Sequence, residues 1–221
     1  MGPLFVAAEG SSRSVTDSFV SMAAARDPAT GRLWGGVLLQ GGRLDLSVNG
    51  RIGSIYAYGE GGRLIGLRVL ENRRFAGGGG AELALGAGPL GEFRLGPAFT
   101  ALAFENNQRF FTFGNGGYFS PQRFFHGAGV LRWQHPGAVR WDAAAEPGYD
   151  WYQEAHAPIL PFDPNSGFYA GKTEGGFSFT GRAFLGIGLG GGFELGLSGA
   201  VQRAPEFQEV RAGVVLRAAG L

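Results

Sequence analysis

The side chains that could perform catalysis are few and scattered in this sequence. The three histidines, His126, His135 and His156, show neither an H-x-x-x-H nor an H-x-x-E spacing, so their pattern predicts no metal site. Cysteine is absent, which excludes thiolate nucleophiles, thiolate metal ligands and disulfides. Ser120 and His126 are too isolated a pair to indicate nucleophilic catalysis. We therefore predict no catalytic residue, no metal and no enzymatic activity.

Two glycine-rich segments match the G-x-G-x-x-G pattern of dinucleotide-binding loops, at Gly86–Gly91 and Gly186–Gly191. Such a loop must be followed by a helix, because the helix N-terminus binds the pyrophosphate. A strand pattern follows both copies instead, so a tight hairpin turn is the better interpretation of each. We predict no cofactor.

The segment 106–122 has a composition suited to sugar contacts. It is rich in aromatic rings and side-chain amides, and it contains no acidic residue. Aromatic faces stack on sugar rings and amides match sugar hydroxyls, so a carbohydrate path is one interpretation. A loop that folds into a barrel mouth as a plug, with packed aromatics, is the other. The residues that we assign to a glucan path through this mouth loop are Phe113, Tyr118, Phe119, Ser120 and Gln122.

Alternation of polar and apolar residues, which is typical of strands, recurs along the whole chain, and helical periodicity is nearly absent. Hairpin signals such as Asn49-Gly50 separate the alternating stretches. We predict about ten strands, at 4–25, 33–48, 52–65, 73–87, 92–105, 122–134, 138–150, 173–187, 192–204 and 207–218.

The connectors between these strands alternate in length. Short turns such as Gly88–Gly91 and His135–Gly137 alternate with longer loops such as Asn106–Pro121 and Trp151–Lys172, and the short Ala204–Glu206 turn is the exception. Short turns at one rim and long loops at the other are typical of an outer-membrane barrel. We therefore predict an all-β fold, an antiparallel up-and-down transmembrane β-barrel, as a single domain over residues 1–221. A soluble β-sandwich is the alternative.

The strands carry charges on one face and large apolar side chains on the other. In a barrel, leucines such as Leu44 and Leu46 would meet lipid and the charged side chains would line a wet lumen. Our candidates for lumen-facing residues are Arg43, Asp45, Glu92, Arg94, Arg140, Asp142, Arg182, Glu194 and Arg211. A purely structural pairing of the arginines among them with the acids is the alternative.

Composition limits the classes of partner. The formal net charge is only +1, so we predict no nucleic-acid partner. Glycine accounts for 42 of the 221 residues. No apolar run approaches the length of a membrane-spanning helix. The residues after Met1 show no signal-peptide pattern. We interpret the glycines as turn residues and as bending points of a curved sheet.

The segment Phe113–Gln122 reads F-G-N-G-G-Y-F-S-P-Q. It resembles the signature F-G-H-G-G-Y-F-S-P-Q in the C-terminal domain of the BcsC family of cellulose synthase operon proteins, with Asn115 in place of the usual histidine. Three upstream segments resemble the same family in the same order: Ser14–Ser18, Arg26–Gly31 and Trp34–Val37. The resemblance covers nearly the whole chain.

The resemblance implies an outer-membrane barrel of about sixteen strands, in the porin size class, that exports nascent cellulose without bond chemistry. This sequence would be the C-terminal part of such a barrel, truncated at its N-terminus. The implied partners are the cellulose chain (a β-1,4-glucan), outer-membrane lipid, a periplasmic tetratricopeptide-repeat region and other cellulose synthase subunits. The implied location is the outer membrane of a Gram-negative cell. A plugged structural or adhesive barrel, and then a small outer-membrane hydrolase, are the alternatives.

Overall fold

A single antiparallel sheet, with its strands in chain order, makes up most of the molecule. The computed structural model describes residues 3–15, 24–190, 192–205 and 207–218. Within these residues the sheet holds eleven strands, of which β2 pairs only with β3. The strands of this sheet are β1 (Leu4–Ser14), β2 (Ala24–Arg26), β3 (Leu33–Gly50), β4 (Gly53–Leu67), β5 (Asn72–Gly88), β6 (Gly91–Phe104), β7 (Arg123–His135), β8 (Val139–Glu154), β11 (Lys172–Gly190), β12 (Phe193–Ala204) and β13 (Phe207–Ala218).

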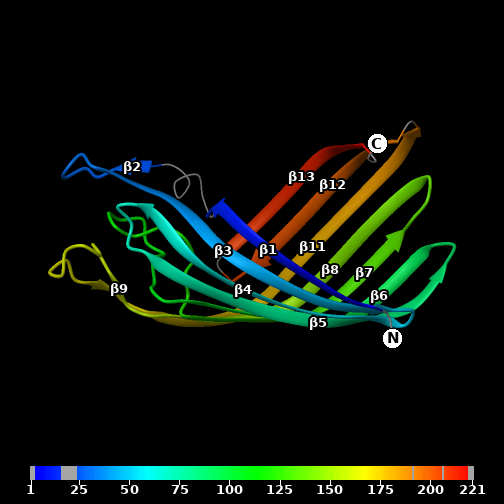
Figure 1. The fold of residues 1–221 in the computed structure, drawn as a ribbon, viewed down its shortest axis with the longest axis horizontal. Helices are drawn as coiled ribbons and strands as arrows, with labels where there is room; N and C mark the ends of the chain where they lie inside the picture. The colour runs from blue at the N-terminus through cyan, green and yellow to red at the C-terminus, as the bar shows by residue number, and fades with distance from the viewer. Residues whose placement is uncertain (1–2, 16–23, 191, 206, 219–221) are drawn as a thin grey trace.

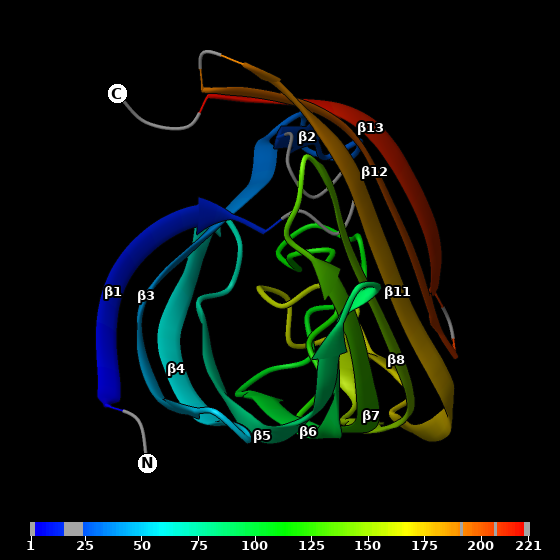
Figure 2. The same ribbon diagram turned by 90° about the vertical axis from the view of Figure 1, so that its right-hand side faces the viewer.

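The sheet is strongly curved. Figure 2 shows the curved sheet from one end. The strands follow one another from β1 through β5 and β6 to β13, which lies on the side opposite β1. β1 and β13 are the two edges of the sheet, so the described strands do not close a ring. The all-β, antiparallel up-and-down architecture is confirmed, and an open wall of this curvature is consistent with a β-barrel.

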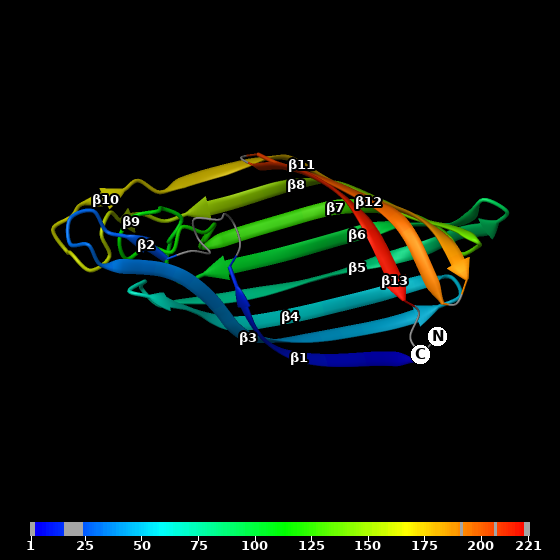
Figure 3. The ribbon, with the colours of Figure 1, turned by 90° about the horizontal axis from the view of Figure 1, so that it is seen from above.

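Most strand connectors also follow the predicted alternation; the short connector between β12, which ends at Ala204, and β13, which begins at Phe207, is the exception. Short turns join β3 to β4, β5 to β6, β7 to β8 and β11 to β12 at one end of the sheet. The longer loops between β4 and β5, β6 and β7, and β8 and β11 gather at the other end (Figures 1 and 3). The last of these loops contains a small hairpin of β9 (Ala157–Pro158) and β10 (Phe168–Tyr169). No helix able to cross a membrane is present in the described part of the chain.

The single strand predicted over residues 4–25 is wrong in detail. Residues 4–14 form β1 and residues 24–26 form β2, and both pair with β3; residues 16–23 lie outside the described residues. The register of β3 against β4 shifts between Gly35 and Leu38, where Gly35 and Gly36 take φ values of 108° and 62°. Because positive φ interrupts an extended backbone, the β3 ladder breaks at this point, between its pairings with β1 and β2.

The two faces of the sheet differ in chemistry. Residues directly opposite each other in an antiparallel pair point to the same face, so the register assigns side chains to faces. One cross-strand row reads Arg94, Arg132, Ala144, Arg182, Ala200 and Arg211. Another reads Leu83, Leu95, Leu131 and Ala145. The arginine row lies on the concave face and the leucine row on the convex face.

The apolar core lies inside the curve, under the long loops. Its buried members are Trp34, Val37, Leu39, Leu64, Val69, Phe104 and Tyr118. Most of them come from the long-loop ends of β3, β4 and β6, and Tyr118 comes from the loop between β6 and β7. The core therefore fixes a loop against the concave wall.

Candidate functional site

The mouth loop, residues 105–122, connects β6 to β7 and folds back into the concave side of the sheet (Figure 2). Backbone hydrogen bonds hold its two ends and its tip. The Phe104 amide donates to Pro121 O over 2.9 Å, and the Gln122 amide donates to Gln153 O over 3.0 Å. The Leu70 amide donates to Gly114 O over 2.9 Å. The loop is thus tied to β8 on one side and to the β4–β5 connector on the other.

Tyr118 is the centre of a buried polar cluster within the mouth loop. Its hydroxyl accepts a hydrogen bond from Asn72 Nδ2 at 3.0 Å and donates one to Gln108 Oε1 at 2.6 Å. The backbone N–H of Gln108 donates to Ser120 Oγ at 2.7 Å. Tyr118, Gln108, Asn72 and Ser120 are all at most 1% exposed. Buried polar groups that satisfy one another in this way specify one loop conformation.

Asn115 ties the mouth loop to the second loop, residues 155–171. Its Nδ2 donates to Thr112 Oγ1 at 2.9 Å and to Pro158 O at 3.1 Å, while the Thr112 hydroxyl donates to Ile159 O at 2.6 Å. Asn115 is fully buried, and its Oδ1 has no hydrogen-bond partner among the described residues. The two loops also stack directly, with the rings of Phe110 and Tyr169 at 3.7 Å between centroids.

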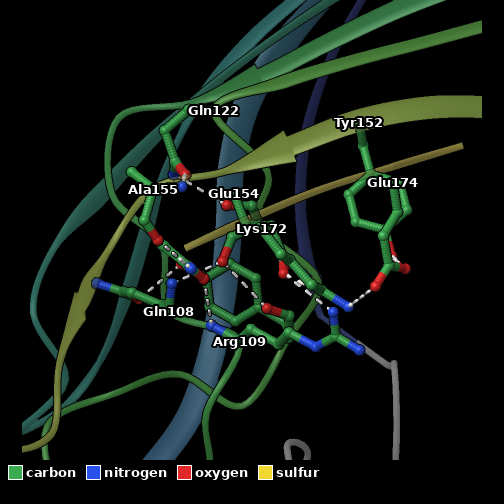
Figure 4. A network of polar contacts seen from close by, with 11 residues as sticks. Gln108, Arg109, Gln122, Tyr152, Glu154, Ala155, Lys172 and Glu174 are labelled. Atoms are coloured by element: carbon green, nitrogen blue, oxygen red, sulfur yellow. Dashed lines mark hydrogen bonds and ion pairs between the residues drawn. The ribbon is translucent and has the colours of Figure 1, made fainter. Parts of the chain in front are cut away.

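A charged network borders the mouth loop on the concave wall (Figure 4). Glu154 has a side chain only 2% exposed, and its Oε2 lies 3.0 Å from Arg109 Nη1 and 4.0 Å from Lys172 Nζ. Lys172 also pairs with Glu174 at 3.3 Å, and Tyr152 donates its hydroxyl hydrogen to Glu174 at 2.6 Å. Two cations therefore offset the charge of the buried Glu154 carboxylate, which makes its burial tolerable.

The five predicted mouth-loop residues have different surroundings in the structure, and most of them serve as packing groups. Tyr118 and Ser120 are buried. Phe119 meets the Tyr152 ring edge-on at 5.2 Å, and Phe113 meets Trp34 edge-on at 6.4 Å. The Gln122 side chain is bonded to the backbone: its Oε1 accepts a hydrogen bond from the Ala155 backbone N–H at 2.6 Å. A sugar ring therefore cannot stack on Tyr118 in this conformation, and the glucan contact of these residues stays a prediction.

All nine predicted lumen-facing residues lie on the concave face by register. Several are paired: Arg43 Nη2 lies 2.7 Å from Asp45 Oδ1, Arg94 Nε lies 2.8 Å from Glu92 Oε1, and Arg140 Nη1 lies 3.9 Å from Glu194 Oε2. Arg211 pairs with Glu209, and Asp142 accepts from Gln134 Nε2 at 2.8 Å. Arg182 lines a shallow pocket with Arg140 and Arg211. That this face borders a lumen stays a prediction.

One cluster of reactive residue types escaped the sequence analysis. On the concave wall, Asp150 Oδ1 lies 2.6 Å from His126 Nδ1 and 3.0 Å from Ser178 Oγ, and Ser178 Oγ lies 3.4 Å from the same histidine nitrogen. A Ser–His–Asp triad needs the serine on Nε2, opposite the aspartate. Here Asp150 and Ser178 both lie at Nδ1 of His126, so the serine does not face the nitrogen that acts as general base in a triad. Strand alternation already places all three residues inward, but only register brings them together.

The structure shows a charged concave face, exposed leucines on the convex face and loops folded into one end. These features place the chain among all-β proteins with an up-and-down antiparallel sheet, in an arrangement consistent with a β-barrel. Comparison with known proteins identifies the family. The model of a family described as "Cellulose synthase operon protein C C-terminus" matches residues 1–219. The chain belongs to this family.

Curated relatives carry the same name. The chain is 32% identical over 216 residues to cellulose synthase operon protein C of Pseudomonas fluorescens (strain SBW25), with 94% of this chain and 17% of the relative covered. It is 33% identical over 167 residues to a cellulose synthase operon protein C of Komagataeibacter xylinus, with 74% and 13% covered. The chain thus spans less than a fifth of the length of these relatives, and the predicted family membership is confirmed.

Proposed function

We propose that this chain forms the wall of an outer-membrane channel that exports bacterial cellulose, a β-1,4-glucan, during cellulose synthesis. The channel makes and breaks no bond. The observation that carries this proposal is the division of one curved sheet into a charged concave face and an apolar convex face. Membership of the cellulose synthase operon protein C family supports the choice of polymer.

The convex face supports contact with lipid. Large apolar side chains stand exposed along it, among them Ile55, Leu83, Leu197 and Val214, each at least 60% exposed. A water-soluble protein rarely exposes apolar side chains over so wide a surface, because doing so promotes association. The hydrocarbon of a bilayer is the environment that this face suits.

Aromatic side chains form two belts on the convex face. Toward the long loops, Phe99 and Phe177 lie in one cross-strand row with Tyr149. Toward the short turns, Trp133 stacks on Phe93 at 5.5 Å between centroids. On β7 this row passes through Gly127, and Phe125 lies two residues beyond it toward the long loops. Phe125 and Trp133 are eight residues apart on β7, which is about 27 Å along a strand and about 20 Å along the membrane normal at a tilt of roughly 40°. This separation fits the apolar band of an outer-membrane barrel.

The concave face supports passage of a neutral polymer. Its charges are of mixed sign and are mostly paired with each other, as in Arg43–Asp45 and Arg94–Glu92. Such a wall holds water without a deep electrostatic trap, and conduction requires many weak sites. The sheet edges β1 and β13 leave room for further strands or a partner to complete the barrel. The periplasmic tetratricopeptide-repeat region and other cellulose synthase subunits are the partners that we propose.

A plugged structural or adhesive barrel is the second candidate, and the packing of the mouth loop favours it. The loop fills the concave side at one rim, with Tyr118 and Asn115 fully buried. An export channel must therefore displace this loop or pass the polymer beside it.

Domain exchange in a cellulose-secreting Gram-negative bacterium tests the proposal. This chain replaces the matched region of the host's operon protein C, and two quantities are measured: the chain in the outer-membrane fraction and the cellulose outside the cell. We expect the exchange to restore secretion to a null strain. Correct membrane insertion without secreted cellulose refutes the export role. Replacing residues 106–121 by a short Gly-Ser linker tests the mouth loop, because unchanged secretion would exclude it from the glucan path.

A further inference from the structure

Two tyrosines on the concave face lie over a run of glycines. Tyr56 and Tyr58 occupy alternate positions of β4, and the register places them opposite Gly80 and Gly78 of β5. These two glycines belong to the run 77–80, the longest uninterrupted glycine run in the sequence. On this stretch of β5 the concave wall has no side chains of its own, so the tyrosine rings can cover it.

The tyrosine rings lie along the wall and do not stand up from it. The Tyr58 hydroxyl is 2.9 Å from Thr100 Oγ1, on β6, so this side chain crosses the whole of β5. Two strand spacings amount to about 10 Å, which only a side chain laid against the sheet can span. A Cβ at Gly78 would lie 2.8 Å from Tyr58 Cε1, and one at Gly80 would lie 2.9 Å from Tyr56 Cζ. The glycines are therefore what allows both rings to lie flat.

The rings of Tyr56 and Tyr58 differ in what covers the face that points away from the glycines. The Arg43 guanidinium carbon lies 4.1 Å from the centroid of the Tyr58 ring, and Asp45 holds that guanidinium with a bond of 2.8 Å to Nε. Tyr56 is half-buried, and no ring or cation covers it among the residues that the structure describes. One aromatic face on the concave wall is thus open, beside one that already holds a planar cation.

Hydrogen-bonding groups flank the open ring. Glu82 lies two residues beyond Gly80 on β5 and on the same face, and its Oε1 is 2.9 Å from Arg132 Nε. Arg43 lies on the other side, over Tyr58. Glu82 is buried, at 6% exposed, so the accessible polar groups beside the ring are the guanidinium donors of Arg43. An aromatic face beside guanidinium donors suits a pyranose ring, whose C–H face is apolar and whose hydroxyls point outward around its edge.

We propose that Tyr56 and Tyr58, lying on Gly80 and Gly78, form a sugar-stacking subsite for a β-1,4-glucan on the channel wall. This inference rests on the proposed export function and names a binding surface for the exported polymer. Tyr56 stacks on one pyranose ring, while Arg43, whose side chain is 38% exposed, binds its hydroxyls. Each contact is weak, so the polymer slides past without being trapped. The subsite lies outside the mouth loop, whose Tyr118 ring is buried.

Titration of the full chain in detergent with cellopentaose, followed by NMR of isotope-labelled tyrosine, tests this subsite. The Tyr56 signal is the one that disappears in Tyr56→Phe. We expect it to move with cellopentaose. We expect Tyr56→Leu to weaken binding about three- to tenfold and Tyr56→Phe to retain affinity within about twofold.

Tyr149→Leu is the matched control, because it removes a tyrosine ring from the convex face, where Tyr149 is 57% exposed. It should leave the affinity unchanged. Equal affinity in Tyr56→Leu and the unmodified chain, or a Tyr56 signal that does not move in the unmodified chain, overturns the subsite. The NMR measurement is made on the unmodified chain and uses Tyr56→Phe only to assign the signal, so it does not depend on the folding of Tyr56→Leu. Secretion that stays intact while the subsite fails leaves the export function standing, and Tyr56-dependent binding without secretion refutes the export function alone.

Discussion

Replacing Tyr118 with phenylalanine removes one hydroxyl from the most buried point of the mouth loop. The ring keeps its packing against Phe104, at 5.8 Å between centroids, so the change is confined to hydrogen bonding. Gln108 Oε1 loses its donor at 2.6 Å, and Asn72 Nδ2 keeps only its bond to Asn106 O at 2.8 Å. The substitution therefore leaves a buried acceptor unsatisfied.

The cost of an orphaned buried acceptor is about 1–3 kcal/mol. If the mouth loop opens as a local unit, this cost raises the population of the open loop by about 5- to 150-fold. Tyr118 and Gln108, the two partners of the lost bond, both belong to the loop, so the cost falls on the closed conformation of the loop. The global unfolding of the sheet should change much less.

Limited trypsin cleavage at Arg109, inside the mouth loop, measures this opening. When the loop opens and closes faster than it is cleaved, the rate follows the open population. We expect cleavage of Tyr118→Phe to be faster by the factor given above. Tyr149→Phe, which removes an exposed hydroxyl on the convex face, should be cleaved at the normal rate. Equal rates for Tyr118→Phe and the unmodified chain would refute the view that Tyr118 closes the loop.

Three further predictions concern the mouth loop, the convex face and the turn at Asp27. Gly117 has a φ of +69°, so Gly117→Ala should destabilise the closed mouth loop by about 1–2 kcal/mol and speed trypsin cleavage at Arg109; an unchanged cleavage rate would contradict this. Ala145→Arg, between the aromatic belts on the convex face, should lower bilayer folding stability by about 2–4 kcal/mol, whereas Gln202→Arg on the concave face should not; equal losses would exclude lipid contact. Hydrogen bonding from the Thr30 hydroxyl holds the pKa of Asp27 below its ordinary 3.8. Because the folded pKa is the lower one, the stabilisation of this turn is complete above pH 3.8 and decreases as the pH falls through the lowered pKa; amide exchange at Thr30 should show this dependence, and Asp27→Asn should abolish it.

The sequence predicted the strands and their faces well, and the contacts of the site poorly. Alternation with a period of two is local, so Arg43 and Asp45 could be placed on one face without any knowledge of neighbouring strands. The partner of Tyr118 could not be placed in this way, because Asn72 is 46 residues away. Glycine in the run 77–80 was interpreted as a bending point, and its contact with the tyrosines was missed.

The mouth loop shows the same limit. Its composition indicated either sugar contact or a packed plug, and both require the same residue types. Burial distinguishes them for the observed conformation, because Tyr118 and Ser120 are inside the protein. The half-buried Tyr56 ring lies elsewhere, on β4, where the sequence shows only an alternating Tyr56-Ala-Tyr58.

By itself, the sequence determined the all-β class, the order of the strands, the alternation of turn lengths and the separation of charge from apolar surface, because each of these depends on neighbours within one strand or one turn. Only the tertiary structure decided which residues meet. Register aligns Tyr56 with Gly80 and brings Asp150 to His126, and curvature brings the mouth loop against Asn72. These contacts depend on pairing between distant segments, and a shift of one residue would turn every side chain of a strand to the other face.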